Sequence, residues 1–325
     1  TDHSPREWRG IEQTPEAQQI EQAHPLTGLR LAISDALRNE AETPYPPSAR
    51  RPAQLHIAHS WGGGLDRWVR QYCEHDRARD NLVLRSIGTW GAFGQRIALY
   101  RSAAMDQPLR YWELGYPIRA TALVHLQYRA ILDEIIADFG IEAVLISSLI
   151  GHSLDALCSG LPTVFVAHDY YPFCPALVIH FGAICERCEL PKLTQCFAEN
   201  EQNRFFRNVT AEEWLALRRR FTELALADTV QFAAPSASVA RHWRTLLPEL
   251  AHRPFTLIPH GLDYTPERLP PPPVGEKLRV VVLGSLAPQK GQALLEQVWP
   301  HVAACVDLYL VGCGEDGERF RHQPG

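Results

Sequence analysis

The stretch "VFVAHDYYPFCP", residues 164–175, is an apolar run that stops at His168 and Asp169. In open α/β sheets, ligands bind beyond the carboxyl ends of the strands, so a strand that ends in this way presents two titratable side chains to a ligand. Imidazole and carboxyl groups can bind hydroxyls and transfer protons. We therefore predict the edge of an active site here, with His168 and Asp169 as the candidate catalytic residues, and with capping or orienting as the alternative role of Asp169. The alternatives are a pair of metal ligands and ordinary packing at the end of a strand.

Four of the eight cysteines form a C-x10-C-x2-C-x7-C array of Cys174, Cys185, Cys188 and Cys196. In a reducing compartment, clustered cysteines favour metal over disulfide, and the central pair has the spacing of a zinc knuckle. The array predicts a structural zinc site. A closed shell of four thiolates leaves no position open for chemistry, so the metal would only organise a loop. The alternative is four small, buried and unliganded residues.

Two glycine-containing turns lie between a strand pattern and a helix pattern, "HSWGGGLDRW" and "LGSLAPQKG". Glycines allow a ligand to approach the backbone closely, and a helix N-terminus favours an anion. The predicted phosphate-binding residues are Gly62, Gly63, Gly64, Gly284, Ser285, Lys290 and Gly291. The second turn is not a P-loop, because the GxxxxGK[ST] spacing is absent. The alternatives are a tight turn that needs positive φ and a solvated surface lysine.

The segment "VGCGEDG" fits GxGxxG through Gly312, Gly314 and Gly317, which raises a nicotinamide-dependent oxidoreductase as a further alternative. Two observations oppose it. Glu315 and Asp316 stand where a pyrophosphate would approach, and no ribose-binding acid can follow at the usual distance before Gly325.

Strand and helix patterns alternate along the chain from residue 54. Apolar runs predict strands over 54–60, 81–87, 96–102, 142–149, 162–168, 231–236 and 254–261. Amphipathic patterns predict helices over 65–75, 120–140, 152–160, 211–229 and 237–247. A second unit repeats the order, with strands over 278–285 and 306–312 and a helix over 292–302. This alternation predicts an α/β fold with parallel sheets and crossover helices.

Composition shifts divide the chain into four parts. Residues 1–50 are predicted to be an extension with one helix, and 51–268 an α/β domain with a cysteine-rich insertion over 174–208. Four consecutive prolines at 270–273 mark a linker over 269–276. Residues 277–325 begin a second α/β domain. Because two strands make no stable domain and no initiator methionine is present, we expect the chain to be a piece of a longer protein.

The composition is that of a soluble globular protein, with 46% hydrophobic and 21% charged residues. A net charge of −5 over 325 residues argues against a general nucleic-acid binder. No apolar stretch approaches the ~20 residues that span a bilayer, and the N-terminus lacks the order of a signal peptide. A cytoplasmic protein is predicted, with at most peripheral contact with the inner face of the membrane.

Five segments in order over residues 54–317 resemble GT-B glycosyltransferases of family 4, also called glycosyl transferases group 1. They are "GGGLDRWV", "GLPTVFVAHDYYPFCP", "LIPHGLD", "LGSLAPQKG" and "LYLVGCGEDG". The "HDYYPFCP" stretch with its downstream cysteines is similar to bacterial members that build surface polysaccharides. The resemblance implies two Rossmann-like domains that face a cleft. The N-terminal domain would bind the acceptor, and the C-terminal domain, incomplete here, would bind the nucleotide-sugar.

The resemblance also implies the chemistry. A sugar would pass from a nucleotide-diphospho-sugar to a glycan or lipid-linked acceptor, with retention and without an obligatory metal. Gly63 and Gly64 would lie near the donor phosphates, His168 near the transferred sugar, and Lys290 at the donor diphosphate. Ser285 replaces an arginine of the family, and the family's E-x7-E region would lie beyond Gly325. This chain alone is therefore not expected to turn over substrate. The alternative is a catalytically incomplete, zinc-stabilised α/β scaffold that binds a glycan or a protein partner.

Overall fold

The computed structural model describes residues 51–89, 92–101, 107–203, 205–206, 208–261, 275, 277–284, 286 and 290–313. The chain divides into two compact units, Thr1–Gly261 (unit 1) and Leu262–Gly325 (unit 2). The predicted helical extension over residues 1–50 lies outside the described residues, as does most of the predicted linker over 269–276.

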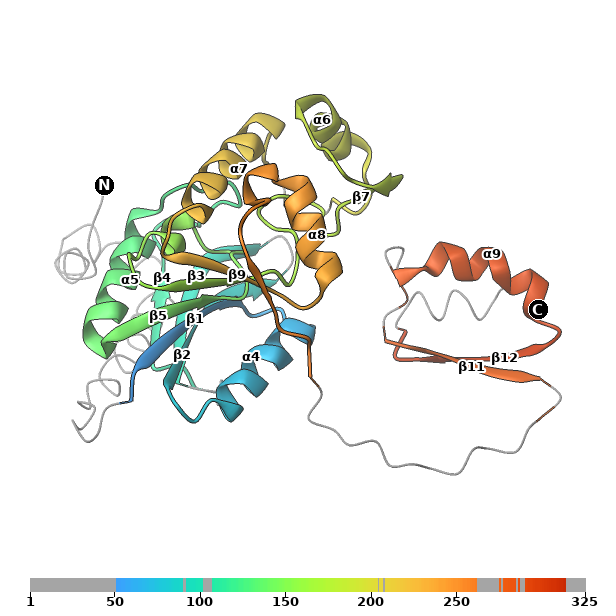
Figure 1. The fold of residues 1–325 in the computed structure, drawn as a ribbon, viewed down its shortest axis with the longest axis horizontal. Helices are drawn as coiled ribbons and strands as arrows, with labels where there is room; N and C mark the ends of the chain where they lie inside the picture. Colours follow the sequence, from blue (N-terminus) through green and yellow to red (C-terminus); the bar gives the residue numbers. More distant parts are fainter. Residues whose placement is uncertain are drawn as a thin grey trace, which may run out of the picture. The chain divides into compact units, whose positions relative to one another are not determined.

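Unit 1 is built on a mixed sheet of eight strands in the order β10-β9-β6-β5-β1-β2-β3-β4 (Figure 1). The strands are β1 (Ala53–His59), β2 (Asp80–Thr89), β3 (Ala92–Arg101), β4 (Arg110–Glu113), β5 (Ile141–Ile146), β6 (Thr163–Val166), β9 (Val230–Ala234) and β10 (Phe255–Leu257). The six strands from β10 to β2 pair in parallel. The predicted α/β class is therefore confirmed.

One edge of the sheet departs from the predicted parallel arrangement. The pairs β2–β3 and β3–β4 are antiparallel, and Thr89 pairs with Ala92, three residues later in the chain. So short a connection permits only a hairpin, because a parallel neighbour needs a crossover of a dozen or more residues. Strand β4 was not predicted from its sequence, "RYWE".

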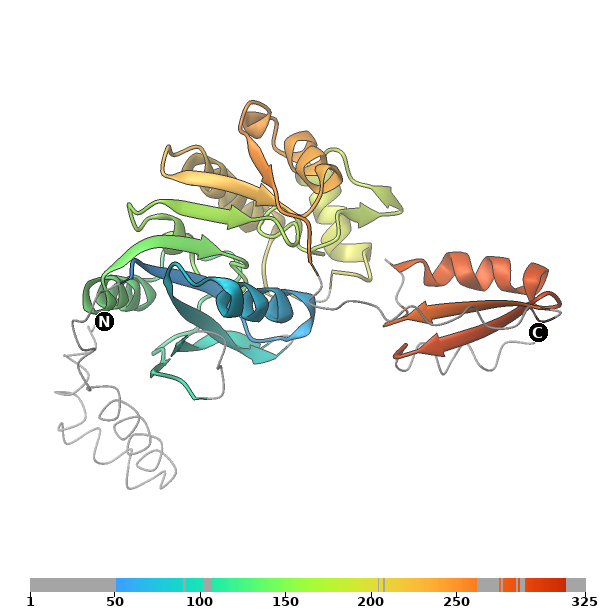
Figure 2. The ribbon, with the colours of Figure 1, turned by 60° about the horizontal axis from the view of Figure 1, so that its bottom comes forward.

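Helices cover both faces of this sheet (Figures 1 and 2). The helices of unit 1 are α4 (Gly63–His75), α5 (Leu126–Phe139), α6 (Leu190–Glu199), α7 (Ala211–Ala225) and α8 (Ala237–Leu246), with 3-10 turns η1 (Leu154–Leu157) and η2 (Pro248–Leu250). Val69 and Cys73 of α4 pack on Ala58 and Val83 of the sheet. Helices α5, α7 and α8 pack on the other face in the main core, where Trp214 and Trp243 are fully buried. This two-sided burial explains the nearly continuous apolar runs of the central strands.

Two predicted helices are shorter than their sequence patterns. Helix α5 begins at Leu126 rather than at residue 120, because His125 caps it and accepts a hydrogen bond from Tyr128 N at 3.2 Å. The predicted helix over 152–160 is only the 3-10 turn η1. There the Asp155 carboxylate accepts from Ser153 Oγ at 2.7 Å and from His125 N at 2.7 Å. Such local side-chain bonds compete with helix formation.

The cysteine-rich insertion contains a small hairpin of β7 (His180–Phe181) and β8 (Ala183–Ile184), followed by α6. Unit 2, within its described residues, pairs β11 (Leu278–Leu283) in parallel with β12 (Val306–Val311) through α9 (Gln292–Val302). The three elements predicted for this segment are confirmed.

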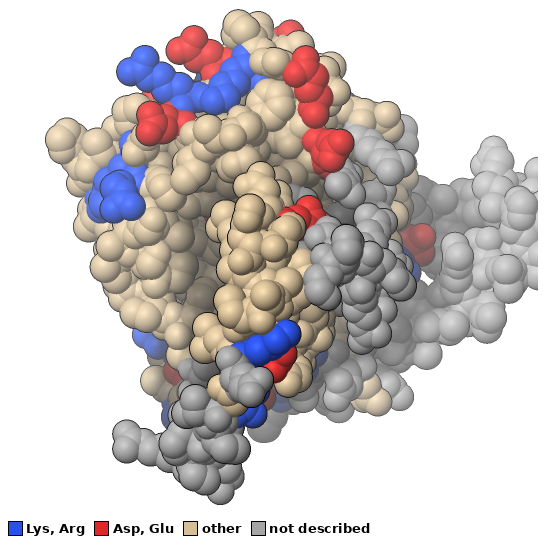
Figure 3. Space-filling model, turned by 90° about the vertical axis from the view of Figure 1, so that its right-hand side faces the viewer, with Lys and Arg blue, Asp and Glu red and all other residues tan. Residues whose placement is uncertain are grey.

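Positive and negative side chains lie interspersed on the face seen in Figure 3, without a large patch of one sign among the described residues. No helix in the described part of the chain is long and apolar enough to cross a membrane.

Candidate functional site

Three histidines meet at the carboxyl ends of strands β1, β6 and β10. His59 is the last residue of β1, His168 follows β6, and His260 follows β10. The rings of His168 and His260 stack with centroids 5.3 Å apart and planes 6° from parallel. His59 lies close enough to contribute to the electrostatic field at His168. The predicted residue His168 is therefore one member of a cluster at this edge.

Sequence reasoning missed His59 and His260. Both carry the signal that identified His168, since each ends an apolar strand-like run, "HIAHS" and "LIPHG". The sheet order brings these strand ends together although they are more than 90 residues apart in sequence from His168 on each side. Sequence spacing carries no such information.

His168 is neutral at physiological pH and has a buried polar atom to satisfy. Burial first, and then the nearby His260 and His59, lower its pKa to about 4. Its Nε2 atom is buried and has no hydrogen-bond partner among the described residues. Buried polar atoms are nearly always paired, so an orphan of this kind at a sheet's carboxyl edge is a candidate contact for a polar ligand.

Asp169 has a structural partner of its own. Its Oδ1 accepts a hydrogen bond from Tyr171 N at 2.8 Å, and burial raises its pKa to about 7. The Tyr171 hydroxyl donates to Ala120 O at 2.6 Å. Asp169 therefore holds the turn that follows β6, and its predicted catalytic role stays a prediction.

The three glycines of the first turn differ in what they require. Gly62 and Gly63 both have φ of +75°, whereas Gly64 has no positive φ, and an added Cβ at any of the three would meet nothing within 4 Å. Backbone conformation, and not crowding, therefore requires glycine at the first two positions. Helix α4 begins here without a side-chain cap. One helical turn after Gly64, the Trp68 ring packs edge-on against the His168 ring, with the ring centroids 4.7 Å apart. The start of α4 and His168 therefore belong to the same site.

A cluster of ion pairs, which was not predicted from the sequence, joins α4 to strand β2. The Asp66 carboxylate of α4 accepts from Arg85 Nη2 at 2.5 Å and from Arg70 Nε at 3.0 Å. Burial and then the positive charge of Arg85 lower the pKa of His59 to about 4, against the opposing effect of Asp66. His59 is thus also neutral at physiological pH.

The remaining predicted phosphate-binding residues belong to unit 2. Gly284 has φ of +83°, and Gly291, with φ of +88°, is the N-cap of α9. Lys290 is exposed immediately before that cap. Ser285 lies outside the described residues, as do Gly314 and Gly317 of the GxGxxG match.

The four predicted zinc ligands lie near one another in unit 1. Cys174 is buried, burial raises its pKa to about 12, and Cys196 and Cys185 contribute to the field at its thiol. Cys188 in turn acts on Cys196 and on Cys185. Nevertheless, no group of three or more histidine, cysteine, aspartate or glutamate side chains within the described ranges is arranged to hold a metal ion. The zinc site stays a prediction.

A buried arginine fastens the insertion to α7. Arg218 donates from Nε to Phe173 O at 2.6 Å and from Nη1 to Cys188 O at 2.6 Å. Its Nη2 donates to Cys188 Sγ at 3.2 Å, and its guanidinium lies 4.1 Å from the centre of the Phe173 ring. These contacts join the cysteine-containing loop to α7.

Comparison with known proteins adds no relative. No protein family, curated protein or solved structure was found to match this chain.

Proposed function

We propose that the protein is a retaining glycosyltransferase that moves a sugar from a nucleotide-diphospho-sugar to a glycan or lipid-linked acceptor. The observation that carries the proposal is the buried, unpartnered Nε2 of His168 at the carboxyl edge of the sheet. A neutral imidazole suits a sugar hydroxyl, because it can donate or accept a hydrogen bond without introducing a charge. The ordered resemblance of five segments to family 4 supplies the reaction type.

The glycine turn beside His168 supports a phosphate-containing donor. The first N–H groups of a helix are not used within the helix and attract anions, and α4 has no side-chain cap to occupy them. The open space around Gly64 leaves room for a ligand next to the backbone. Within unit 2, the proposal assigns the binding of the donor diphosphate to Lys290 and to the start of α9, which Gly291 caps.

The proposed reaction needs little proton transfer by the protein. The bond between the anomeric carbon and the donor phosphate oxygen breaks, and a bond to the acceptor oxygen forms on the same face. The acceptor proton passes to the departing diphosphate. His168 would hold the transferred sugar, and the backbone amides and Lys290 would stabilise the charge that develops on the diphosphate.

A thermal-shift panel tests this proposal on the full-length gene product. The ligands are UDP, GDP, ADP, dTDP, their sugars, and NAD as a control for the oxidoreductase alternative. A ligand whose concentration is a hundred times its Kd stabilises the folded state by about 2.7 kcal/mol. We therefore expect one nucleoside diphosphate and the corresponding nucleotide-sugar to raise Tm. Lys290→Ala should abolish the shift, whereas Lys277→Ala, a second exposed lysine of unit 2, should not. A folded protein that no nucleoside diphosphate stabilises would contradict the proposal.

A further inference from the structure

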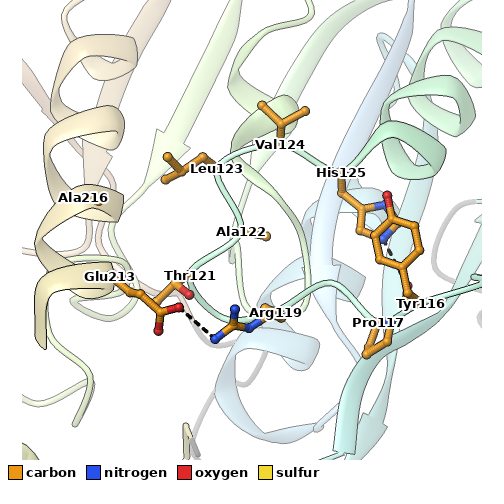
Figure 4. A pocket seen from close by; sticks show the side chains of 10 residues that line it. All are labelled: Tyr116, Pro117, Arg119, Thr121, Ala122, Leu123, Val124, His125, Glu213 and Ala216. Carbon is orange, nitrogen blue, oxygen red and sulfur yellow. Dashed lines mark hydrogen bonds and ion pairs between the residues drawn. The ribbon is translucent and has the colours of Figure 1, made fainter. Parts of the chain in front are cut away.

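A pocket of about 320 Å³ lies between the loop that precedes α5 and the first turns of α7. Figure 4 shows Arg119 and Glu213 pointing toward each other on one side and the Tyr116 ring on the other, with Leu123 and Val124 along the loop. Its volume is at the lower end of the ~300–1,000 Å³ typical of small-molecule sites. The pocket therefore has room for a small ligand and not for a folded segment of a protein.

The loop that lines the pocket is hydrogen-bonded to two segments at the carboxyl edge of the sheet. Ala120, within its loop, accepts a hydrogen bond from the hydroxyl of Tyr171, two residues after Asp169. The backbone N–H of His125 donates to Asp155, in the segment that follows β5. These bonds connect the pocket's loop to the segment that follows β5 and to the segment that follows β6. His168 lies in the second of these segments.

The charges of the pocket lining favour a neutral ligand. Arg119 Nη2 donates to Glu213 Oε1 at 2.9 Å and to Asn208 O at 3.1 Å. The pair neutralises itself, and both side chains stay partly exposed, at 57% and 35%. An anion bound here would face Glu213 and a cation would face Arg119, whereas a hydroxyl can accept from the guanidinium and donate to the carboxylate.

His125 adds a ring to the lining and no available polar atom. Its Nδ1 accepts from Tyr128 N at 3.2 Å, which leaves Nε2 as the donor to Tyr116 O at 3.0 Å. The Tyr116 side chain tilts against this imidazole, with centroids 4.3 Å apart, and is 47% exposed. An exposed aromatic ring beside exposed Leu123 and Val124 can cover the apolar face of a ligand.

From these contacts, we infer that the pocket binds one neutral sugar unit of the acceptor. A pyranose has an apolar face of C–H groups, which the Tyr116 ring can cover, and an edge of hydroxyls, which can bridge Arg119 and Glu213. Thr121 adds a hydroxyl to the lining. The role as acceptor subsite rests on the proposed function, whereas the binding of a neutral sugar rests on the pocket alone.

Saturation-transfer NMR with methyl glycosides of glucose, galactose, mannose, rhamnose and N-acetylglucosamine tests this inference. We expect at least one glycoside to bind the wild-type protein and to bind about tenfold more weakly to Tyr116→Ala. Tyr116→Phe should bind like wild type, because the ring is kept and the bond from His125 goes to the backbone carbonyl. Tyr309→Ala removes a comparably exposed tyrosine, at 50%, from unit 2 and should have no effect.

The ion pair is tested in the same assay. Arg119→Met should weaken glycoside binding, whereas Arg220→Met breaks the equally short Arg220–Glu223 pair on α7 and should not. The inference is overturned if no glycoside binds, or if binding persists unchanged in Tyr116→Ala and Arg119→Met. If no nucleotide raises Tm but a glycoside binds as expected, the proposed function is overturned and the assignment of this pocket as a sugar site is kept.

Discussion

At the scale of single residues, Gly64 offers a direct probe of ligand approach. It occupies the first turn of α4, has no positive φ, and has open space where a Cβ would lie. Gly64→Ala should therefore keep or raise stability, by up to ~1 kcal/mol from helix propensity. If a donor phosphate contacts this backbone, the same change should weaken nucleotide binding about tenfold or more. Urea unfolding and nucleotide titration measure the two effects.

Gly63→Ala provides the contrast for that experiment. Its φ of +75° strains any L-residue, so the variant should lose about 1–2 kcal/mol of stability. Equal nucleotide affinity in wild type and Gly64→Ala would show that no phosphate contacts the backbone at Gly64. The glycines of the turn would then serve only its backbone conformation.

Part of the site at this scale is predictable from the sequence. A polar residue that ends an apolar strand run marks His168, and the same rule applied throughout would also have found His59 and His260. The contact between the His168 and His260 rings could not be predicted, because it depends on the order of strands in the sheet. The pairing of Asp66 with Arg85 is unpredictable for the same reason.

At the scale of elements, Arg218 holds the cysteine-rich insertion against α7. Arg218→Met removes hydrogen bonds to Phe173 O and Cys188 O and leaves those carbonyls without this donor. We expect a loss of about 2–4 kcal/mol, because hydrogen bonds from charged groups are worth more than neutral ones. Urea unfolding measures the loss. Arg219→Met, at the exposed neighbouring position of α7, should change stability by less than ~0.5 kcal/mol.

Comparable stability in these two variants would contradict that account of the insertion. It would mean that another contact carries the loop, and a zinc ion bound by the four cysteines would then be the first alternative to test by metal analysis.

Sequence periodicity predicted most elements and failed where local bonds compete with it. The apolar spacing over 120–125 continues a helix pattern, yet His125 caps α5 after those residues. The strand over 96–102 was predicted and corresponds to β3, but its antiparallel pairing and strand β4 were missed, because alternation of strands and helices cannot reveal a hairpin that breaks the series.

At the scale of the whole molecule, buried histidines set the response to acid. Burial lowers the pKa of His56, His59, His152 and His168 to about 4. In the unfolded chain the pKa of these groups is ~6.5. Between pH ~6.5 and pH ~4 the unfolded state therefore binds more protons than the folded state, and stability falls as pH falls. Asp169 opposes them, since its pKa is raised to about 7 and the folded state binds its proton more readily. Four groups outweigh one, so the net effect is acid destabilisation.

Urea-unfolding midpoints at pH 7.5 and pH 5 measure this effect. We expect a clearly lower midpoint at pH 5 and a smaller difference in His152→Gln, which removes one of the buried imidazoles. The exposed His252 is the matched control, and His252→Gln should respond to pH like wild type. A midpoint that is unchanged or higher at pH 5 would show that the four imidazoles are not held neutral by burial.

The most direct test of the proposed function compares two titrations, one with the nucleotide-sugar that the panel identifies and one with its bare nucleoside diphosphate. If Nε2 of His168 binds the transferred sugar, His168→Ala should weaken the nucleotide-sugar about three- to tenfold and leave the nucleoside diphosphate unchanged. The control His252→Ala should change neither. Equal weakening of both ligands, or of neither, would contradict a sugar contact at His168.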